Sequence, residues 1–204
     1  MSEANLTNAN AYRRQEILRL QDQNRQLQDE VRTLNEFIRA LDELYALGDE
    51  FKDDSELLPF LRSTLEMAMR LLKSSDASLA LFDEEKQDLV FVIVHGELAD
   101  ELVGTRIPID QGIIGWVARN AKPTLISNVR GDLRFSAVVD DQFSYRTESI
   151  AAAPLVGDGK LYGVVEVLNM RTDEAGMQQG LTLLKLMCRV AGEVLDIIDQ
   201  HKVT

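Results

Sequence analysis

The sequence has few of the residues on which several classes of protein depend. Its 204 residues include one cysteine, two histidines, one tryptophan and four prolines. A single cysteine, Cys188, cannot form an intrachain disulfide, and no signal peptide opens the chain, so we expect a cytoplasmic protein. The apolar runs fall far short of the roughly 20 residues that span a bilayer, so no membrane partner is expected.

Basic residues are also in the minority. The 22 Lys and Arg stand against 34 Asp and Glu, which gives a formal net charge of −12. Such a field repels a phosphate backbone, so the composition argues against nucleic acid as a partner. A chain of this length, 45% hydrophobic, can bury one sizeable core. We therefore expect one globular domain with an appendage.

Recognisable catalytic arrangements are missing as well. The sequence contains no glycine-rich phosphate loop and no serine-histidine-acid set. Its histidines, His95 and His201, have no ligand spacing that would predict a metal or haem site. We expect a protein that is not an enzyme and that holds no metal.

The sequence does contain a heptad repeat near its N-terminus, with Asn24 as the one polar member. Largely β-branched a positions with leucine at d favour two parallel helices, and an asparagine at a selects one register. An amphipathic helix packed on its own domain, with Asn24 tolerated, is the alternative. The predicted interface of the homodimer consists of Ile17, Leu20, Asn24, Leu27, Val31, Leu34, Ile38, Leu41 and Tyr45.

A charged stretch that begins at Gly48 follows the repeat and predicts a domain boundary. The apolar stripe widens just before it, at Phe37 and Leu44, so we expect the two coil helices to join a helical bundle there. The resulting division is a disordered segment over 1–12, a coiled-coil helix over 13–48, a globular domain over 55–200 and a tail over 201–204.

The globular part alternates helical and strand periodicities. It predicts a first helix over 56–73, capped by Asp54 or Ser55, and a long closing helix over 177–200. Two hairpins lie between them, and the second contains an Asp-Gly step typical of a tight turn. The segment between the hairpins, 96–149, is long enough to build a binding surface. Strands are expected over 77–82, 89–95, 105–109, 124–128, 150–156 and 161–168, and a short helix over 113–120.

Two stretches, Ile107 to Phe135 and Arg146 to Asn169, resemble the GAF domain family. The likeness covers about residues 56–200 and is carried by Gly112, Gly115, Pro123, Asp132, Arg134, Phe135, Ser149, Pro154 and Leu155. It implies an α+β fold, a GAF-like six-stranded antiparallel sheet with helices on both faces, preceded here by a parallel dimeric coiled coil. It also implies that the terminal helices cover one face and the inserted loops form a ligand pocket on the other.

One carboxylate, Glu166, interrupts the otherwise apolar last strand. A carboxylate on a covered strand must be paired, protonated or turned toward a ligand. An ion pair with Arg134 or Arg146 explains Glu166 as well as a ligand does, and core packing explains the aromatic candidates equally well. Asp132 and Arg134 are expected to fasten a loop. The candidate ligand-binding residues are Glu166, Phe135, Phe143, Tyr145, Arg146, Thr147, Ser149 and Trp116.

The residue types present disfavour several activities of the family that the sequence resembles. Cys188 belongs to the closing helix, where it is expected to be a buried core residue, so neither bilin attachment nor two-cysteine sulfoxide reduction is expected. The cyclic nucleotide signature is degraded, because Asn128 precedes Val129 and the spacing of Phe135 from Asp140 and Asp141 is altered. We predict no cofactor, and an unidentified small molecule remains the candidate ligand.

Two functions agree with this reading. The first is a regulatory homodimer whose GAF-like domain senses a small molecule and is coupled to the coil. Since no output domain follows Thr204, it is expected to act on a separate effector protein. The second is a dimeric interaction scaffold whose pocket has no function.

Overall fold

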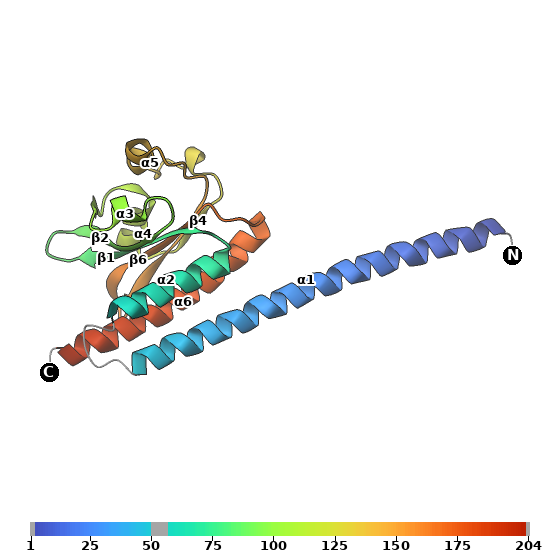
Figure 1. Ribbon diagram of the computed structural model, residues 1–204, viewed down its shortest axis with the longest axis horizontal. Coiled ribbons are helices and arrows are strands. Elements are labelled where there is room, and N and C mark those ends of the chain that lie inside the picture. The colour runs from blue at the N-terminus through green and yellow to red at the C-terminus, as the bar shows by residue number, and fades with distance from the viewer. Residues whose placement is uncertain (1–2, 50–56, 203–204) are drawn as a thin grey trace. The chain divides into compact units, whose positions relative to one another are not determined.

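The computed structural model describes residues 3–49 and 57–202 (Figure 1). The chain divides into two units, residues 1–39 and residues 40–204. Helix α1 spans Glu3–Asp49. It begins at Glu3, whereas the coiled-coil helix was predicted to begin at residue 13. The segment over 3–12 has neither glycine nor proline, and extending a helix that is already nucleated costs little free energy.

The second unit is built on one antiparallel sheet of six strands, in the order β3-β2-β1-β6-β5-β4. This confirms the predicted six-stranded antiparallel sheet. Strands β1 and β6 lie at its centre and pair with each other, so that Ser78 faces Glu166 and Leu79 faces Val165. The strands are β1 (Asp76–Asp83), β2 (Asp88–His95), β3 (Arg106–Pro108), β4 (Thr124–Ile126), β5 (Ile150–Gly157) and β6 (Lys160–Leu168).

The tight turn between β5 and β6 forms at the predicted Asp-Gly step. Asp158 and Gly159 both have positive φ, 42° and 80°, as the two central residues of a type I′ turn require. This turn fixes the register of the two strands, in which Ala152 lies opposite Glu166. Glu166 is thereby placed between a serine on one neighbouring strand and an alanine on the other.

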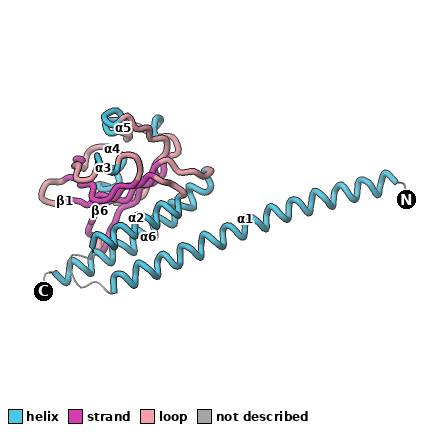
Figure 2. Tube along the Cα trace, in the orientation of Figure 1, coloured by secondary structure: helices cyan, strands magenta, loops and turns pink. Residues whose placement is uncertain are grey.

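One face of the sheet is covered by the terminal helices α2 (Leu57–Leu72) and α6 (Glu174–Lys202), which lie side by side (Figures 1 and 2). Both were predicted from their helical periodicity. Helix α6 packs so closely on β5 that a Cβ on Gly192 would collide with the Val156 backbone. Cys188 is fully buried on α6, and its burial raises the pKa of the thiol above its usual value. The caps expected at Asp54 and Ser55 lie outside the described residues.

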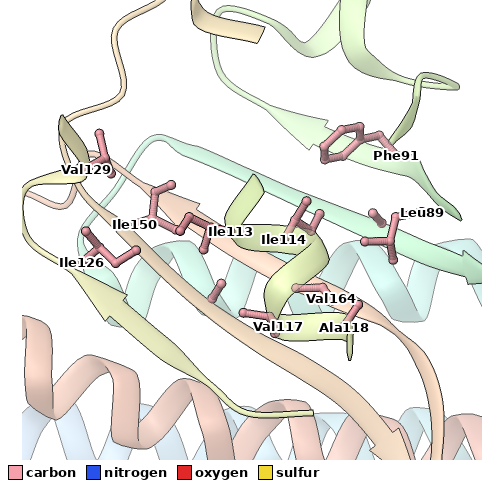
Figure 3. Close-up of a cluster of buried hydrophobic side chains, with 12 residues drawn as sticks. Leu89, Phe91, Ile113, Ile114, Val117, Ala118, Ile126, Val129, Ile150 and Val164 are labelled. Atoms are coloured by element: carbon pink, nitrogen blue, oxygen red, sulfur yellow. The ribbon is translucent and has the colours of Figure 1, made fainter. Parts of the chain in front are cut away.

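The opposite face is covered by α4 (Gly112–Asn120) and the loops of the inserted segment. Figure 3 shows the hydrophobic cluster that joins them to the sheet, with Ile113 and Val117 of α4 among the side chains of β2, β5 and β6. Three short elements of this segment were not predicted: α3 (Ala99–Leu102), the 3-10 helix η2 (Val129–Gly131) and α5 (Val138–Phe143). Elements of three to six residues are too short to produce a recognisable periodicity.

Candidate ligand-binding site

A cavity of about 220 Å³ lies on the sheet face that α4 covers. Its lining comes from the central strands, from β2 and β3, from the first turn of α4 and from the segment around α5. It is larger than the cavity of roughly 150 Å³ that binds benzene in an engineered protein. The polar lining residues include Asp76, Ser78, His95, Arg106, Asp140, Tyr145, Thr147 and Glu166.

Among the carboxylate side chains that line this cavity, Glu166 is the second most buried after Asp140, with a relative exposure of 8%. Burial raises the pKa of Glu166 to about 7, while hydrogen bonding to the Ser78 side chain acts in the opposite direction. Arg134 pairs with Asp132 at 2.7 Å and Arg146 pairs with Glu148 at 3.4 Å. Neither arginine therefore forms the ion pair that was the alternative explanation of Glu166.

A second group of polar side chains borders the cavity at the ends of β1 and β2. The Tyr145 hydroxyl lies near Asp76, and burial together with that carboxylate raises the pKa of Tyr145 above its usual value. The same hydroxyl accepts a hydrogen bond of 3.1 Å from the Asn169 amide. His95 is half-buried, and its Nε2 is a buried atom that has no hydrogen-bond partner within the described chain.

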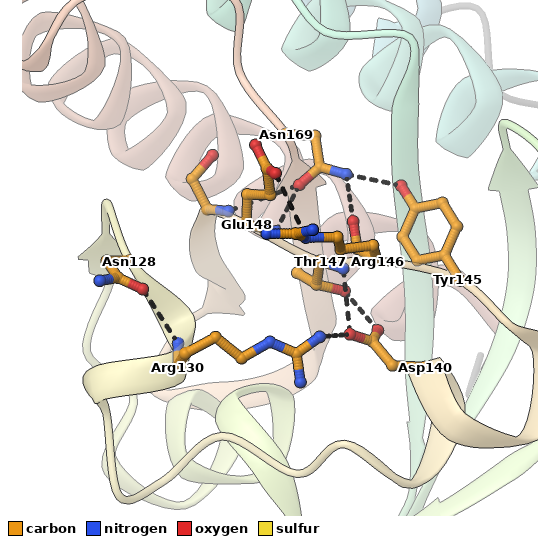
Figure 4. Close-up of polar contacts among 9 residues, drawn as sticks. Asn128, Arg130, Asp140, Tyr145, Arg146, Thr147, Glu148 and Asn169 are labelled. Carbon is orange, nitrogen blue, oxygen red and sulfur yellow. Dashed lines mark hydrogen bonds and ion pairs between the residues drawn. The ribbon is translucent and has the colours of Figure 1, made fainter.

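Asp140 fastens the loop that forms one wall of the cavity (Figure 4). It is 5% exposed, and its carboxylate accepts hydrogen bonds from the Thr147 backbone N–H at 3.0 Å and from the Thr147 hydroxyl at 2.6 Å. Arg130 completes the arrangement with an ion pair of 2.7 Å. Both carboxylate oxygens are engaged within the protein, so the role that the contacts support for Asp140 is to shape the wall.

Asn169 secures the same segment from the end of β6, as Figure 4 shows. Its side-chain oxygen accepts from the Glu148 N–H at 2.7 Å, and its amide donates to the Arg146 carbonyl at 2.9 Å. Its backbone has a φ of 50°, in the left-handed region that asparagine tolerates better than most residues. Asn169 therefore holds in place the segment beside Tyr145 that leads into β5.

Five of the eight predicted site residues line the cavity: Glu166, Phe135, Phe143, Tyr145 and Thr147. The other three lie outside its lining. Trp116 packs beside the hydrophobic cluster, with the Arg134 guanidinium 4.4 Å from its ring centre. Arg146 is exposed. The Ser149 hydroxyl accepts a hydrogen bond from the Met170 N–H. Asp132 and Arg134 pair within the loop as predicted, and this pair keeps the pKa of Asp132 low, at about 2.

Several residues of the site were missed by sequence reasoning. Asp76 and His95 stand at strand ends, where a polar residue normally meets solvent, so their types gave no signal. Asn169 carried one recognisable signal, since an asparagine directly after a strand often adopts positive φ. Within the described residues no three His, Cys, Asp or Glu side chains meet as a metal site requires. The described helices also include none that combines the length and the apolarity needed to cross a bilayer.

Comparison with known proteins agrees with this architecture. A family model for the GAF domain matches residues 56–195. The probable 3',5'-cyclic phosphodiesterase pde-5 of Caenorhabditis elegans is 27% identical over 128 residues, which are 58% of this chain and 18% of that protein. The cone cGMP-specific 3',5'-cyclic phosphodiesterase subunit alpha' of Gallus gallus is 26% identical over 164 residues, 72% of this chain and 19% of that protein. The chain thus spans less than a fifth of the length of these relatives.

Solved structures share the fold at low sequence identity. The nlh2 GAF domain of A. aeolicus, in an inactive state, superimposes with a TM-score of 0.65 at 16% identity, over 81% of this chain and 98% of that one. Residues 122 to 287 of a methyl-accepting chemotaxis protein give a TM-score of 0.62 at 22% identity, over 79% of this chain and 99% of that one. The chain belongs to the GAF domain family of regulatory, small-molecule-sensing domains found in signalling proteins.

Proposed function

We propose that this chain is a regulatory homodimer in which the GAF domain senses a small molecule and α1 forms a parallel coiled coil. The observation that carries the proposal is the cavity of about 220 Å³, walled by the buried Glu166, on the sheet face opposite α2 and α6. The domain acts by binding rather than by catalysis, and it needs no metal or cofactor. We place it in the cytoplasm, without a nucleic acid or membrane partner, where it controls a separate effector protein.

The central strands give a route from the cavity to the terminal helices. Alternate residues of β6 point to opposite faces. Glu166 lies at the cavity, while Val165 and Val167 are buried on the α2 and α6 side. Because α6 touches β5 through backbone atoms at Gly192 and Val156, a shift of the strands moves the helix directly. A ligand that binds one arrangement of the strands better than another therefore biases the helices.

The exposed side chains of α1 support the dimer. Its apolar seam residues are about half exposed in the single chain, at steps of three and four residues, as a stripe that awaits a partner helix would be. The exposed fractions are 54% for Ile17, 52% for Leu20, 60% for Leu27, 57% for Val31, 46% for Leu34 and 54% for Ile38. Asn24 is also exposed on this helix, and the side chain of Tyr45 lies outside the described residues.

The proposed helical bundle has support of its own in the second unit. Leu58 of α2 and Leu186 of α6 are 54% and 43% exposed. Both belong to the helix layer. They lie on the side that faces away from the sheet, whereas the buried residues of α2 and α6 cover the sheet. Such exposed leucines are suited to contact a second copy of the chain. The side chain of Leu44, part of the widened stripe, lies outside the described residues.

Two experiments test this function. Leu27→Lys with Leu34→Lys places charges in the seam and is expected to give monomers by light scattering, whereas Gln26→Lys with Thr33→Lys, on the outer side of the heptad, leaves a dimer. A thermal-shift screen is the second test. A specific ligand at 100 times its dissociation constant adds about 2.7 kcal/mol to the free energy of unfolding. A dimer that survives the two seam substitutions contradicts the coiled-coil interface and would mean that the bundle face holds the dimer. No shift from any small molecule contradicts the sensor and favours an interaction scaffold without a working pocket.

A further inference from the structure

The charges around the cavity are unequal. Its lining contains three carboxylates, Asp76, Asp140 and Glu166, but one guanidinium, Arg106. Arg106 is engaged by two aspartates, with Nε at 2.6 Å from Asp88 and a further ion pair to Asp83. These contacts hold the pKa of Arg106 above its usual value and leave the guanidinium little capacity for an anionic ligand. Among the described residues that line the cavity, none is an uncommitted arginine or lysine.

Only one of the three carboxylates, Glu166, has no charged or phenolic partner among the described residues. Asp140 is engaged by Thr147 and Arg130, and Asp76 accepts a hydrogen bond of 2.8 Å from the Ser75 hydroxyl and lies near the Tyr145 hydroxyl. Glu166 projects from central strand β6, opposite Ser78 of β1. The surrounding walls are apolar and aromatic, with Phe91 and Phe135 among them. A buried carboxylate in such walls gains most from a hydrogen-bond donor.

His95 gives a second, independent observation. Its Nε2 is buried and has no hydrogen-bond partner in the part of the chain that the structure describes, and His95 is one of the residues that line the same cavity. Buried polar atoms are rarely left without a partner in folded proteins. A bound polar ligand is a natural partner for this nitrogen.

The N-terminus of α4 adds positive charge to the cavity wall and so opposes the effect of the carboxylates. The first turn of α4 lines the cavity at Gly112 and Ile113, and the side chain of Gln111 does not cap it. A helix N-terminus carries about half a unit of positive charge. This is less than the charge of Asp76 and Glu166 when both are ionised, so it suits a carbonyl or ring acceptor of the ligand rather than a doubly charged phosphate.

We propose that the cavity takes a compact, largely apolar ligand that carries a hydrogen-bond-donating nitrogen, either an amine or a ring N–H, toward Glu166, and that bears no phosphate. The inference rests on the proposed sensing function and names its ligand class. It also separates this domain from a role that the names of its phosphodiesterase relatives suggest, since a cyclic nucleotide brings a phosphate into a cavity bordered by carboxylates.

The pH dependence of binding follows from the same groups. Ser78 on β1 lies opposite Glu166. The other titratable or charged groups of the cavity lining are Asp76, His95, Arg106, Asp140 and Tyr145. Burial raises the pKa of Glu166 to about 7, so below that pH the protein must lose a proton before an amine can pair with it. Amine affinity is therefore expected to fall by up to about tenfold per pH unit below 7.

The test uses the full-length chain and a matched set of probes: benzylamine, benzyl alcohol and benzyl phosphate, titrated by calorimetry at about pH 7.5 and about pH 5.5. We expect benzylamine to bind at least about tenfold more tightly than benzyl phosphate, a difference of 1.4 kcal/mol. We also expect its affinity to fall at the lower pH. Glu166→Gln should remove both effects, while Glu148→Gln, which alters an exposed carboxylate, should leave them unchanged.

Tighter binding of benzyl phosphate overturns the ligand class but leaves the sensor intact. Failure of all three probes also overturns the ligand class, whereas the sensor itself is judged by the thermal-shift screen. If Glu166→Gln does not fold, the wild-type comparison of the two pH values decides, because an affinity for benzylamine that is equal or higher at pH 5.5 contradicts the assignment of Glu166 as the acceptor.

Discussion

Thr147 donates two hydrogen bonds to the same carboxylate, that of Asp140, seven residues earlier in the chain. The backbone N–H lies 3.0 Å from one oxygen and the hydroxyl 2.6 Å from the other. Arg130 approaches the carboxylate from the side that is more open to solvent. This arrangement determines where the wall of the cavity lies, and it gives the first prediction.

Asp140→Ala is expected to lower the free energy of unfolding by about 3 kcal/mol, because it leaves the buried Thr147 N–H and hydroxyl without an acceptor. The neighbouring Asp141 is exposed on the same short helix. Asp141→Ala should therefore change stability by less than about 0.5 kcal/mol. Urea unfolding measures both, and equal effects would mean that Asp140 does not fasten the loop.

The second prediction concerns the backbone of Asn169. Replacing its side chain removes the hydrogen bonds to Glu148, Arg146 and Tyr145, and alanine adds strain at a φ of 50°. We expect Asn169→Ala to be less stable than Asn169→Gly by about 1 kcal/mol, the reverse of the usual order, since glycine adopts positive φ freely. Thermal unfolding of the two variants compares them, and an alanine variant that is the more stable refutes the account of this turn.

The third prediction tests the contact between α6 and the sheet. Glycine to alanine inside a helix normally stabilises by up to about 1 kcal/mol. At Gly192 the added methyl would collide with the Val156 backbone, so we expect Gly192→Ala to destabilise the domain by about 2 kcal/mol or more. Gly131→Ala, where the methyl meets open space, is the control. Stabilisation by Gly192→Ala would show that the helix does not approach the strand this closely.

The fourth prediction is a pH dependence of stability. The folded-state pKa of Glu166, about 7, lies above its ordinary value of 4.5, so the folded protein binds more protons than the unfolded one between these values. Its contribution is fully present below about pH 4.5 and is lost as the pH rises through 7. The difference amounts to about 3 kcal/mol.

Glu166→Gln isolates that contribution, because glutamine does not titrate. The stability of the wild-type protein relative to this variant should fall by about 3 kcal/mol between pH 4.5 and pH 8, as measured by chemical unfolding at each pH. A difference that stays constant across this range would show that Glu166 is ionised and well solvated in the folded state. The cavity would then be more open to water than its lining indicates.

Much of this fold was predictable because the long elements have clear periods. The hairpins were placed within a residue or two, and the Asp158-Gly159 step correctly predicted a tight turn. The start of α1 at Glu3 was not predicted, because residues 3–12 lack the apolar repeat that marked the rest of the helix. Helix formation there follows from propagation and needs no repeat.

The candidate site was predictable where a residue broke its local pattern. Glu166 stood out because a carboxylate on an apolar central strand has to be explained. Trp116 and Ser149 did not join the cavity, because the tryptophan is taken by Arg134 and the hydroxyl by Met170, and both contacts depend on loop paths that periodicity does not encode. Asp76 and His95 were missed because their roles depend on the register of the sheet and on Tyr145, far away in the sequence.

The central claim, that the cavity is coupled to the coil, is tested most directly by the distance between two copies of α1. Spin labels at Asp29→Cys in a Cys188→Ala background report that distance by double electron–electron resonance. Val94→Trp fills the cavity from its lining, and Leu133→Trp adds the same side chain on the surface. The account predicts a changed distance distribution with the first substitution and an unchanged one with the second. Identical distributions for both, in variants that remain folded and dimeric, would contradict it.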